Sequence, residues 1–450
     1  MDIGKNQIEL IDYAKKYISM INGTGVNISK SAYCWLVPVP GAPGYFILKR
    51  LYNKGKLTLK SIYFFFKYFI GIAILHDYKI INRISNLEKN YNRLIISFAW
   101  KNNFNNDGSY TDNYLNLNSK QDLKNLWFLI YLEDDGKIPN KIDKNILIFG
   151  KENLKRKYCF FYLLKVFFNI IKNSKSSLTK IFHESSRPSH YSEIVIKEVT
   201  NLIKSLNFKS ILMSYENQPF QNGIFESVKK INNNIKLIGY LHSTQPLPVL
   251  HICRSGSPDL LLVHGDDQIF HLKKYLNWHD SKLKLIPALR YNKNNIKKFG
   301  NNLVLPINLS NEKILLNQFD FFLKNKNNKS LKSFTIRNHP FRKNSKSHKI
   351  FIKNLENILS RYSDKFSNNI QNEISVFFGG TSSVLEALES GFKVNHICAD
   401  PVFESYSEAI WPSIRVRAIN DFLFEYELSH KGKCINLGSG DNIFEKYPEL

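Results

Sequence analysis

The chain has 450 residues, enough for two or three domains, and its 43% hydrophobic and 14% aromatic content excludes a largely disordered protein. Its 63 Lys and Arg against 38 Asp and Glu give a net charge of +25, which attracts polyanions such as nucleic acid, anionic lipid or phosphorylated sugars. Lys, Asn and Ile are all frequent, as in proteins from AT-rich genomes, so the charge by itself does not indicate nucleic-acid binding.

The five cysteines are too far apart in the sequence to form a CxxC motif or a Cys/His cluster. An odd number of scattered cysteines is typical of reduced thiols in a cytosolic protein, so we expect neither a disulfide framework nor a zinc site. The first residues, MDIGKNQIELIDYAKK, carry charges where a signal peptide needs an apolar core. We therefore expect a cytoplasmic protein.

Two apolar segments of the first half also carry lysines. Residues 61–75 (SIYFFFKYFIGIAIL) are interrupted by Lys67, and residues 156–175 contain Lys165 and Lys172. Neither segment reaches the roughly 18–20 uninterrupted apolar residues of a membrane-spanning helix. Two interpretations stay open: helices buried in the protein core, or basic amphipathic helices that lie on an anionic surface such as the inner membrane.

The first half alternates predicted strands with helices, a pattern that is typical of parallel sheets. The strand RLIISFAW leads into the polar loop KNNFNNDGSYTDNY, and LWFLIYL leads into EDDG. Helices are predicted at 191–207 and 266–278. Strands are predicted at 93–100, 126–132, 145–150, 210–216, 235–243 and 260–265.

A basic, Asn-rich stretch without apolar periodicity, residues 290–301, separates this half from the next. We predict an N-terminal domain at 1–295, a C-terminal domain at 296–430 and a tail at 431–450. Two α/β domains joined in this way place a cleft between the carboxyl ends of their strands, where such folds bind ligands. In the second half, strands are predicted at 302–310, 333–340, 374–380 and 393–397, and helices at 311–325 and 348–362.

The stretch FFGGTSSVLEALESG, residues 377–391, joins a predicted strand to a short amphipathic helix. Gly379 and Gly380 let the backbone approach a ligand closely, and Ser382 or Ser383 can cap the helix. The N–H groups at such a helix start bind phosphate readily. Glu386 lies one turn further along and could reach ribose hydroxyls. An ordinary helix cap is the alternative, because the turn lacks the P-loop lysine and the GxGxxG pattern.

The stretch TIRNHP places His339 at the end of another predicted strand, where Pro340 disfavours helix. A histidine in that position can hydrogen-bond to a phosphate or donate a proton to it. Arg337 and Arg342 add positive charge nearby. A purely structural His339 is the alternative, but its place about 40 residues before the Gly/Ser turn, in the same domain, favours a shared site.

TIRNHP followed by GGTSSVLEALESG resembles the donor domain of bacterial GT-B glycosyltransferases that build surface polysaccharides, above all sialyltransferases and Kdo transferases, which use CMP-activated acidic sugars. SYENQPFQNGIFESVKK and IGYLHSTQPLP are similar to strand ends of capsule-type transferases, and the resemblance spans residues 212–397. It implies an α/β fold of two Rossmann-type domains whose parallel sheets face a central cleft. It also implies that His339 contacts the donor phosphate, and that Thr381, Ser382 and Ser383 bind the phosphate or the cytidine.

Bacterial sialyltransferases also carry a (D/E)(D/E)G motif that supplies the general base, and EDDG at 133–136 matches it, which implies that role for Asp135. The reaction needs one carboxylate within hydrogen-bond reach of the acceptor hydroxyl. Asp107 in a long loop, Asp112 close to it and Glu216 at a strand end are further candidates, and the sequence does not choose among them. His242, which ends another strand, either contacts a substrate or bonds to a backbone carbonyl.

The sequence therefore predicts an inverting glycosyltransferase that moves a sugar, with a CMP-activated acidic sugar favoured, from a nucleotide sugar to a surface glycan or lipid-linked acceptor, as in capsule or lipopolysaccharide synthesis. We expect no metal ion, no cofactor besides the donor, no specific nucleic acid, and peripheral contact with the inner membrane. The alternatives are a sugar-nucleotide epimerase of similar architecture, a non-catalytic polysaccharide-assembly protein, and a nucleic-acid-binding protein. No RNP, KH or helix-turn-helix signature supports the last of these.

Overall fold

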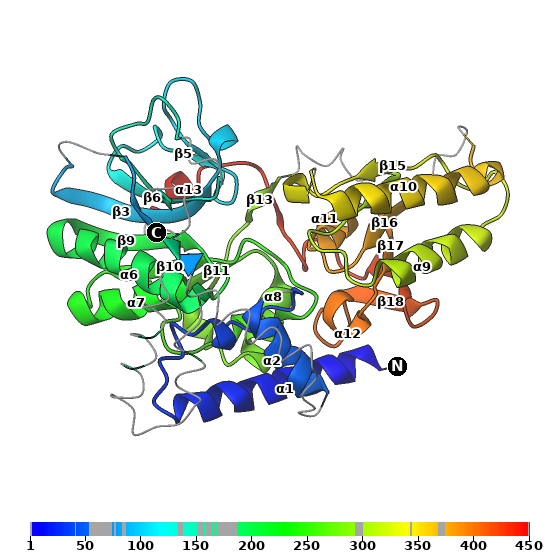
Figure 1. The fold of residues 1–450 in the computed structure, drawn as a ribbon, viewed down its shortest axis with the longest axis horizontal. Helices are drawn as coiled ribbons and strands as arrows, with labels where there is room; N and C mark the ends of the chain where they lie inside the picture. The colour runs from blue at the N-terminus through cyan, green and yellow to red at the C-terminus, as the bar shows by residue number, and fades with distance from the viewer. Residues whose placement is uncertain are drawn as a thin grey trace.

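The chain forms two α/β halves, which lie on the left and right of Figure 1 with strand β13 (Ala288–Asn292) between them. Each half is built on its own sheet, and the strands within each sheet are mostly parallel. The computed structural model describes residues 2–40, 42–53, 74–75, 78–82, 87–133, 138–151, 157–158, 164, 168, 183, 187–292, 300–342, 344–367, 374–448 and 450.

The first sheet has eight strands, and all neighbours are parallel except the edge pair β2 and β7. Parallel neighbours place their carboxyl ends along one edge of the sheet. The polar loops that follow these strands therefore gather on that edge. In spatial order the strands are β12 (Leu283–Leu285), β11 (Leu260–Val263), β10 (Lys236–Tyr240), β9 (Asn207–Ser214), β3 (Asn90–Ala99), β6 (Asn125–Tyr131), β7 (Ile146–Lys151) and β2 (Tyr78–Ile80).

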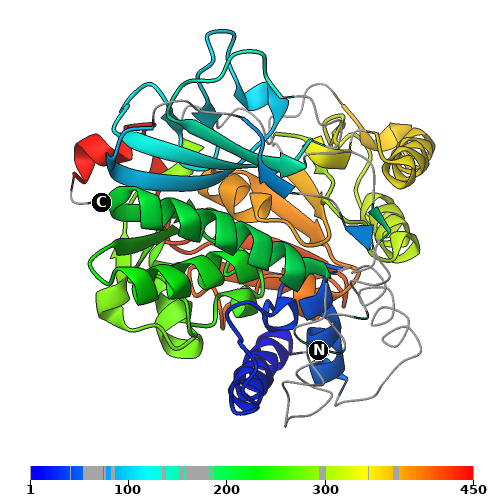
Figure 2. The same ribbon diagram turned by 60° about the vertical axis from the view of Figure 1, so that its left-hand side comes forward.

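Both faces of the first sheet are buried, which explains its nearly continuous apolar strands. Successive side chains of a strand point to opposite faces, so Leu94 and Ile96 enter one core and Ile95 enters the other. Helices α6 (Arg187–Ser205) and α7 (Pro219–Ile231) cover the first face and lie side by side in Figure 2. The loop after β3 and helix α13 (Ile443–Lys446) cover the second face.

The second sheet has six strands: four neighbours are parallel, the fifth runs antiparallel to them, and the edge strand pairs antiparallel with that fifth strand. Helices α9 (Glu312–Lys324) and α10 (Lys346–Arg361) pack on one of its faces through Phe319 and Phe351. The strands in spatial order are β15 (Thr335–Arg337), β14 (Asn302–Val304), β16 (Ile374–Phe378), β17 (Lys393–Ile397), β19 (Leu423–Leu428) and β18 (Ile414–Ala418).

The two ends of the chain each cross to the opposite half. Helix α1 (Ile3–Asn22) packs against α12 (Pro401–Glu404), and Gln7 Nε2 donates to the carbonyls of Val402 and Ser405 at 3.1 and 2.8 Å. The tail returns through β20 (Leu437–Gly438), which pairs with β13. The remaining elements are α2 (Pro43–Tyr52), α8 (Asp266–Tyr275), α11 (Ser383–Glu389), α13 (Ile443–Lys446) and the short strand pairs β4–β5 (Thr111–Asp112, Leu117–Asn118) and β1–β8 (Ile74–Leu75, Lys157–Tyr158).

One hydrophobic cluster runs without a break from the first sheet into the second. At the junction the Trp411 ring packs 4.8 Å from the ring of His271, and its Nε1 donates to the carbonyl of Pro246 at 3.2 Å. The Tyr406 hydroxyl lies 3.1 Å from the carbonyl oxygens of Thr244 in the first half and Thr381 in the second. The halves therefore share a core instead of meeting across a solvated interface.

The predicted fold class, α/β with two Rossmann-type domains whose parallel sheets face a central cleft, is confirmed. The predicted boundary at 295 lies outside the described residues, between β13 and β14. The segment 290–301, read as a linker, begins with the last part of β13. The edge strands β18 and β19 and helix α7 were not predicted, because polar residues interrupt their patterns.

Most of the two segments at 61–75 and 156–175 lies outside the described residues. Residues 74–75 and 157–158, predicted as helix, instead form strands β1 and β8, which pair antiparallel. Leu164 and Phe168 are helical. In the part of the chain that the structure describes, no helix combines the length and apolarity needed to cross a membrane, and the four described cysteines are unpaired thiols.

Several buried histidines make the stability of this fold depend on pH. Burial lowers the pKa of His251, His264 and His271 to about 3 and that of His396 to about 4, so these rings are neutral in the folded protein at pH 7. In the unfolded chain a histidine titrates near pH 6.5. Below that pH the unfolded state binds more protons, so we expect the free energy of unfolding to fall on acidification, by at most about 1.4 kcal/mol per pH unit and histidine.

Urea unfolding followed by circular dichroism at several values between about pH 7 and pH 4 measures this slope. His271→Gln should reduce the dependence of the unfolding free energy on pH by the contribution of one histidine, at most about 1.4 kcal/mol per pH unit. The exposed His279 offers a matched substitution, His279→Gln, which should leave it unchanged. A free energy of unfolding that stays constant over this range would contradict the prediction.

Candidate functional site

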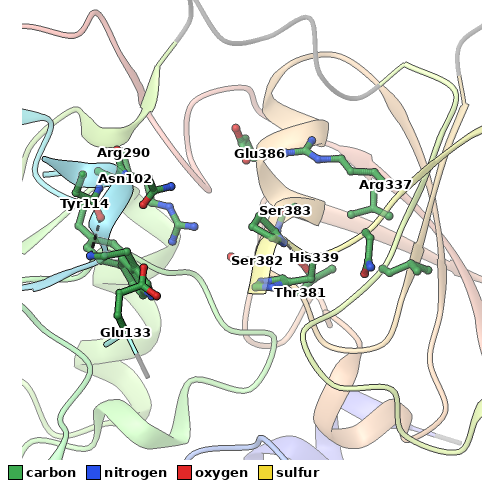
Figure 3. A pocket seen from close by; sticks show the side chains of 17 residues that line it. Asn102, Tyr114, Glu133, Arg290, Arg337, His339, Thr381, Ser382, Ser383 and Glu386 are labelled. Atoms are coloured by element: carbon green, nitrogen blue, oxygen red, sulfur yellow. Dashed lines mark hydrogen bonds between the residues drawn. The ribbon is translucent and has the colours of Figure 1, made fainter. Parts of the chain in front are cut away.

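A cavity of about 540 Å³ opens between the two halves, at the carboxyl ends of strands from both sheets. Figure 3 shows its two walls facing each other, with Asn102, Tyr114, Glu133 and Arg290 on one side and the residues of the second half on the other. Its lining residues are Trp100, Asn102, Asn103, Asn113, Tyr114, Glu133, Arg290, Val304, Leu305, Arg337, Asn338, His339, Pro340, Thr381, Ser382, Ser383 and Glu386.

The wall from the second half contains six of the eight residues that the sequence assigns to donor binding. Arg337 ends β15 and His339 follows it, and the turn between β16 and α11 brings Thr381 to Ser383 beside them. Glu386 stands on the first turn of α11. Residues more than 40 positions apart in the sequence thus meet because β15 and β16 flank β14 in one parallel sheet.

The two glycines of the turn do not line the cavity. Gly379 has φ +59°, a left-handed conformation that a residue with a Cβ adopts at a cost, and a Cβ there would lie 3.2 Å from Pro306 Cγ. Gly380 has ordinary space around it. The glycine requirement that the sequence suggests for both positions therefore applies to Gly379.

The turn is also fastened to the first half. Thr381 Oγ1 accepts the N–H of Ser383 at 3.3 Å, and Ser382 Oγ accepts the hydroxyl of Tyr291, on β13, at 3.4 Å. The Ser382 carbonyl accepts the hydroxyl of Thr244 at 3.5 Å. These contacts fix the hydroxyl groups of the turn relative to both sheets.

His339 lies in a positive electrostatic field. Burial lowers its pKa to about 4, and the charges of Arg290, His348, Arg342 and Arg337 act in the same direction. The imidazole is therefore neutral at pH 7 and keeps one N–H to donate. Arg342 does not line the cavity, because its guanidinium donates to the carbonyl of Ile307 and to Asn308 Oδ1 at 2.8 and 2.9 Å.

The opposite wall carries aromatic, amide and acidic side chains from the loops that follow β3 and β6, and Arg290 from β13. Asp112 holds the first loop in shape: its carboxylate accepts the Tyr110 hydroxyl at 2.8 Å and the N–H groups of Tyr114 and Leu115 at 2.8 and 2.6 Å. Burial raises the pKa of Asp112. This carboxylate is fully enclosed, and its bonds position Asn113 and Tyr114 on the cavity wall.

Glu133, the first residue of the EDDG segment, follows β6 on the same wall. Glu133 lines the cavity, and its Oε1 accepts the N–H of Lys101 at 3.1 Å. Asp135, the residue that the resemblance favours as general base, lies outside the described residues. Asp107 does not line the cavity: it pairs with Lys120 at 2.7 Å and accepts the Ser109 N–H and hydroxyl, and these partners hold its pKa well below the usual range.

Glu216 and His242 form a pair behind this wall. Glu216 Oε1 lies 3.1 Å from His242 Nε2, and Glu216 Oε2 accepts Gln218 Nε2 at 2.9 Å. Burial raises the pKa of Glu216, but the charge and hydrogen bond of His242 outweigh it and lower the pKa to about 2. Neither residue lines the cavity, and the His242 ring packs 4.4 Å from the Tyr114 ring, which does.

Sequence reasoning missed Arg290, Trp100, Asn102, Asn113 and Tyr114. All except Arg290 follow β3 at its carboxyl end. The sequence marks this region as a long polar loop and suggests Asp107 as its functional residue, whereas the structure places aromatic and amide residues of the loop on the cavity wall. Arg290 is the first residue of the basic stretch that the sequence suggests as a linker. Among the lysines of that stretch, nothing in the sequence distinguishes it as a site residue. In the described parts of the chain no three His, Cys, Asp or Glu side chains gather closely enough to hold a metal ion.

No protein-family model matches the chain, and no curated protein matches its sequence. Three solved structures show some likeness to it: α,α-trehalose 6-phosphate synthase from Burkholderia multivorans (11% identity, 67% of this chain and 80% of that chain, TM-score 0.35), a glycosyltransferase from Rickettsia africae (8%, 68% and 79%, 0.33), and the N-terminal domain of trehalose-6-phosphate phosphatase from Candida albicans (12%, 69% and 82%, 0.34). Scores of this size assign neither a family nor an activity.

Substituting the two glycines that flank α11 should separate backbone strain from crowding. Gly379→Ala places a Cβ at φ +59°, inside the left-handed region, and Gly391→Ala at φ +89°, beyond it, so backbone strain costs about 1–2 kcal/mol at Gly379 and at least as much at Gly391. A Cβ at Gly391 meets nothing within 4 Å, whereas one at Gly379 meets Pro306. We expect Gly379→Ala to lower the free energy of unfolding more than Gly391→Ala, as measured by urea denaturation, and an equal loss would contradict the crowding at Pro306.

Proposed function

We propose that the protein is a glycosyltransferase, which moves a sugar from a nucleotide-sugar donor to a hydroxyl group of a glycan or lipid-linked acceptor. The observation that supports it most is the pairing of two unlike walls across one cavity. One wall carries Arg337, His339 and the hydroxyl groups of the turn, which suit a phosphate, and the other carries aromatic rings, amides and Glu133, which suit a sugar, with Arg290 beside them.

The donor phosphate would lie against Arg337, His339 and the hydroxyl groups of Thr381 to Ser383. Arginine binds phosphate oxygens through two parallel N–H bonds, and neutral His339 can donate one more. Helix α11 has only seven residues, so its dipole contributes less than these side chains. Glu386, on the same wall, is the candidate for the ribose hydroxyls.

The general base would come from the acidic segment after β6, either Asp135 as the resemblance implies or Glu133, which lines the cavity. That carboxylate takes the proton of the acceptor hydroxyl while the oxygen attacks the anomeric carbon of the donor. The bond between this carbon and the phosphate oxygen breaks on the opposite side, and the phosphate leaves with the electron pair. A single displacement of this kind inverts the anomeric configuration.

The positive charge of Arg337 and a hydrogen bond from neutral His339 can stabilise the leaving phosphate, as a divalent cation does in other transferases. We therefore propose that the reaction needs no metal ion, and that activity persists in EDTA. The resemblance of the donor turn favours a CMP-activated acidic sugar as donor and a bacterial surface polysaccharide as product. It also favours work at the inner face of the membrane, where lipid-linked acceptors are found.

A thermal-shift screen of CMP, CDP, UDP and GDP tests the donor site. The nucleotide that fits should raise the melting temperature, since a ligand at 100 times its Kd stabilises the folded state by about 2.7 kcal/mol. His339→Ala should reduce this shift, and the exposed His279→Ala should not. If none of the four nucleotides shifts the melting temperature of the wild type, the donor site is wrongly assigned. Conversion of UDP-GlcNAc to its epimer without an acceptor would point to an epimerase instead.

Substitution of the acidic segment tests the base. Glu133→Gln or Asp135→Asn should lower kcat by about 10²–10⁴-fold, because the acceptor proton loses its recipient, while the nucleotide Kd changes little. Asp107→Asn is the matched control, because Asp107 pairs with Lys120 on the surface and should leave kcat unchanged. Full activity in both acidic-segment variants, with a kcat loss in Glu216→Gln, would assign the base to Glu216.

A further inference from the structure

Arg290 reaches the cavity from β13, the strand that connects the two halves. The strand is well anchored: the Leu289 N–H donates to the Tyr240 hydroxyl at 2.9 Å, and β13 pairs with β20. The next residue, Tyr291, donates its hydroxyl to Ser382 Oγ at 3.4 Å. The strand that connects the halves therefore places the Arg290 guanidinium in the cavity that Thr381 to Ser383 also line.

Arg290 lies beside two aromatic rings, and behind one of them stands a His–Glu pair. Its Cζ lies 5.5 Å from the centre of the Tyr114 ring and 5.5 Å from that of Tyr291. Tyr114 in turn packs against the His242 ring at 4.4 Å, with the rings inclined by 63°, and His242 Nε2 lies 3.1 Å from Glu216 Oε1. A cation over an aromatic ring is attracted to its face, so these contacts favour one position of the guanidinium.

The charge of Arg290 acts on the opposite wall. Among the charged groups that lower the pKa of His339, Arg290 is the strongest, ahead of Arg342 and Arg337, which are much closer to His339 in the sequence. Arg290 and His339 line the same cavity from different walls. An anion between these walls would receive bonds from both.

We propose that Arg290 binds the phosphate of the nucleotide donor, and that Tyr114, His242 and Glu216 are positioning residues that hold its guanidinium in place. This inference rests on the proposed function, since it names a further ligand for the same donor. A planar guanidinium suits the oxygens of a phosphate, where it forms two parallel N–H bonds. Glu216, a candidate base from its sequence position, here acts through His242 and Tyr114 instead of on the acceptor.

The role of Glu216 follows from its surroundings. Both of its carboxylate oxygens are engaged, one with His242 and one with Gln218, and its pKa of about 2 makes it a weak proton acceptor. Through its contact with His242, Glu216 supports the Tyr114 ring beside which the Arg290 guanidinium lies. Replacing Glu216 should therefore weaken phosphate binding without abolishing the chemistry.

Isothermal titration calorimetry with CMP, CDP, UDP and GDP tests the assignment of Arg290. For the nucleotide that the wild type binds best, Arg290→Gln should raise the Kd at least 10-fold. Arg415→Gln removes the same charge from an exposed position on β18, outside the cavity, and should change the Kd less than 2-fold. Equal Kd values for Arg290→Gln and Arg415→Gln would overturn the inference and leave the proposed function standing.

Three further variants test the positioning residues. Tyr114→Ala should raise the Kd about as much as Arg290→Gln, and Tyr114→Phe, which keeps the ring, should restore it to within about 2-fold of the wild type. Glu216→Gln should raise the Kd several-fold while the melting temperature without nucleotide stays close to that of the wild type. The double variant of Arg290→Gln and Tyr114→Ala should bind no more weakly than Arg290→Gln alone. Both substitutions remove the same interaction, the one between the Arg290 guanidinium and the phosphate.

Additive losses in the double variant, or a Tyr114→Phe protein that binds as poorly as Tyr114→Ala, would overturn the positioning role. The melting temperature of each variant without nucleotide shows whether a loss of binding reflects a loss of folding. If the wild-type protein binds none of the four nucleotides, this inference and the proposed function fall together.

Discussion

The hydroxyl group of Tyr406 is shared between the two halves of the protein, and the geometry of the cavity depends on it. One O–H donates to the carbonyls of Thr244 and Thr381, each at 3.1 Å, which keeps the first sheet and the turn at residues 379–383 at a fixed separation. Around it the hydrophobic cluster continues from one half into the other through Trp411. Protein interiors are packed as densely as crystals, so a shared core resists relative movement of the two sheets. Both sheets together therefore form the base of the cavity.

Much of this arrangement could be predicted from local patterns. Strands such as β3, β6 and β16 are apolar runs that end at polar loops, and the parallel order of their sheets follows from the alternation with helices. His339 and the GGTSS turn could be paired because both follow strands of one domain. Those features are encoded within a few residues of sequence, where turn chemistry and hydrophobic period are strong signals.

What could not be predicted depends on contacts between distant segments. Glu216 and Asp107 look alike in the sequence, since each follows a strand and each is acidic. Only the fold separates them, by pairing one with buried His242 and the other with exposed Lys120. Arg290 could not be predicted for a similar reason, because nothing in the sequence distinguishes it from the many other basic residues. Its position in space depends on a hydrogen bond from Leu289 to Tyr240 and on the pairing of β13 with β20 in the tail.

The pairing of β13 with β20 has a topological consequence. The outgoing and returning passages of the chain are hydrogen-bonded side by side, and each terminal segment is packed on the half opposite to its neighbours in sequence: α1 on α12, and the tail on the first sheet. The protein is therefore interlaced. A protease that cut the chain once between the sheets would produce two fragments. A terminal segment of each fragment would stay packed on the other, so the nicked molecule would remain a non-covalent complex.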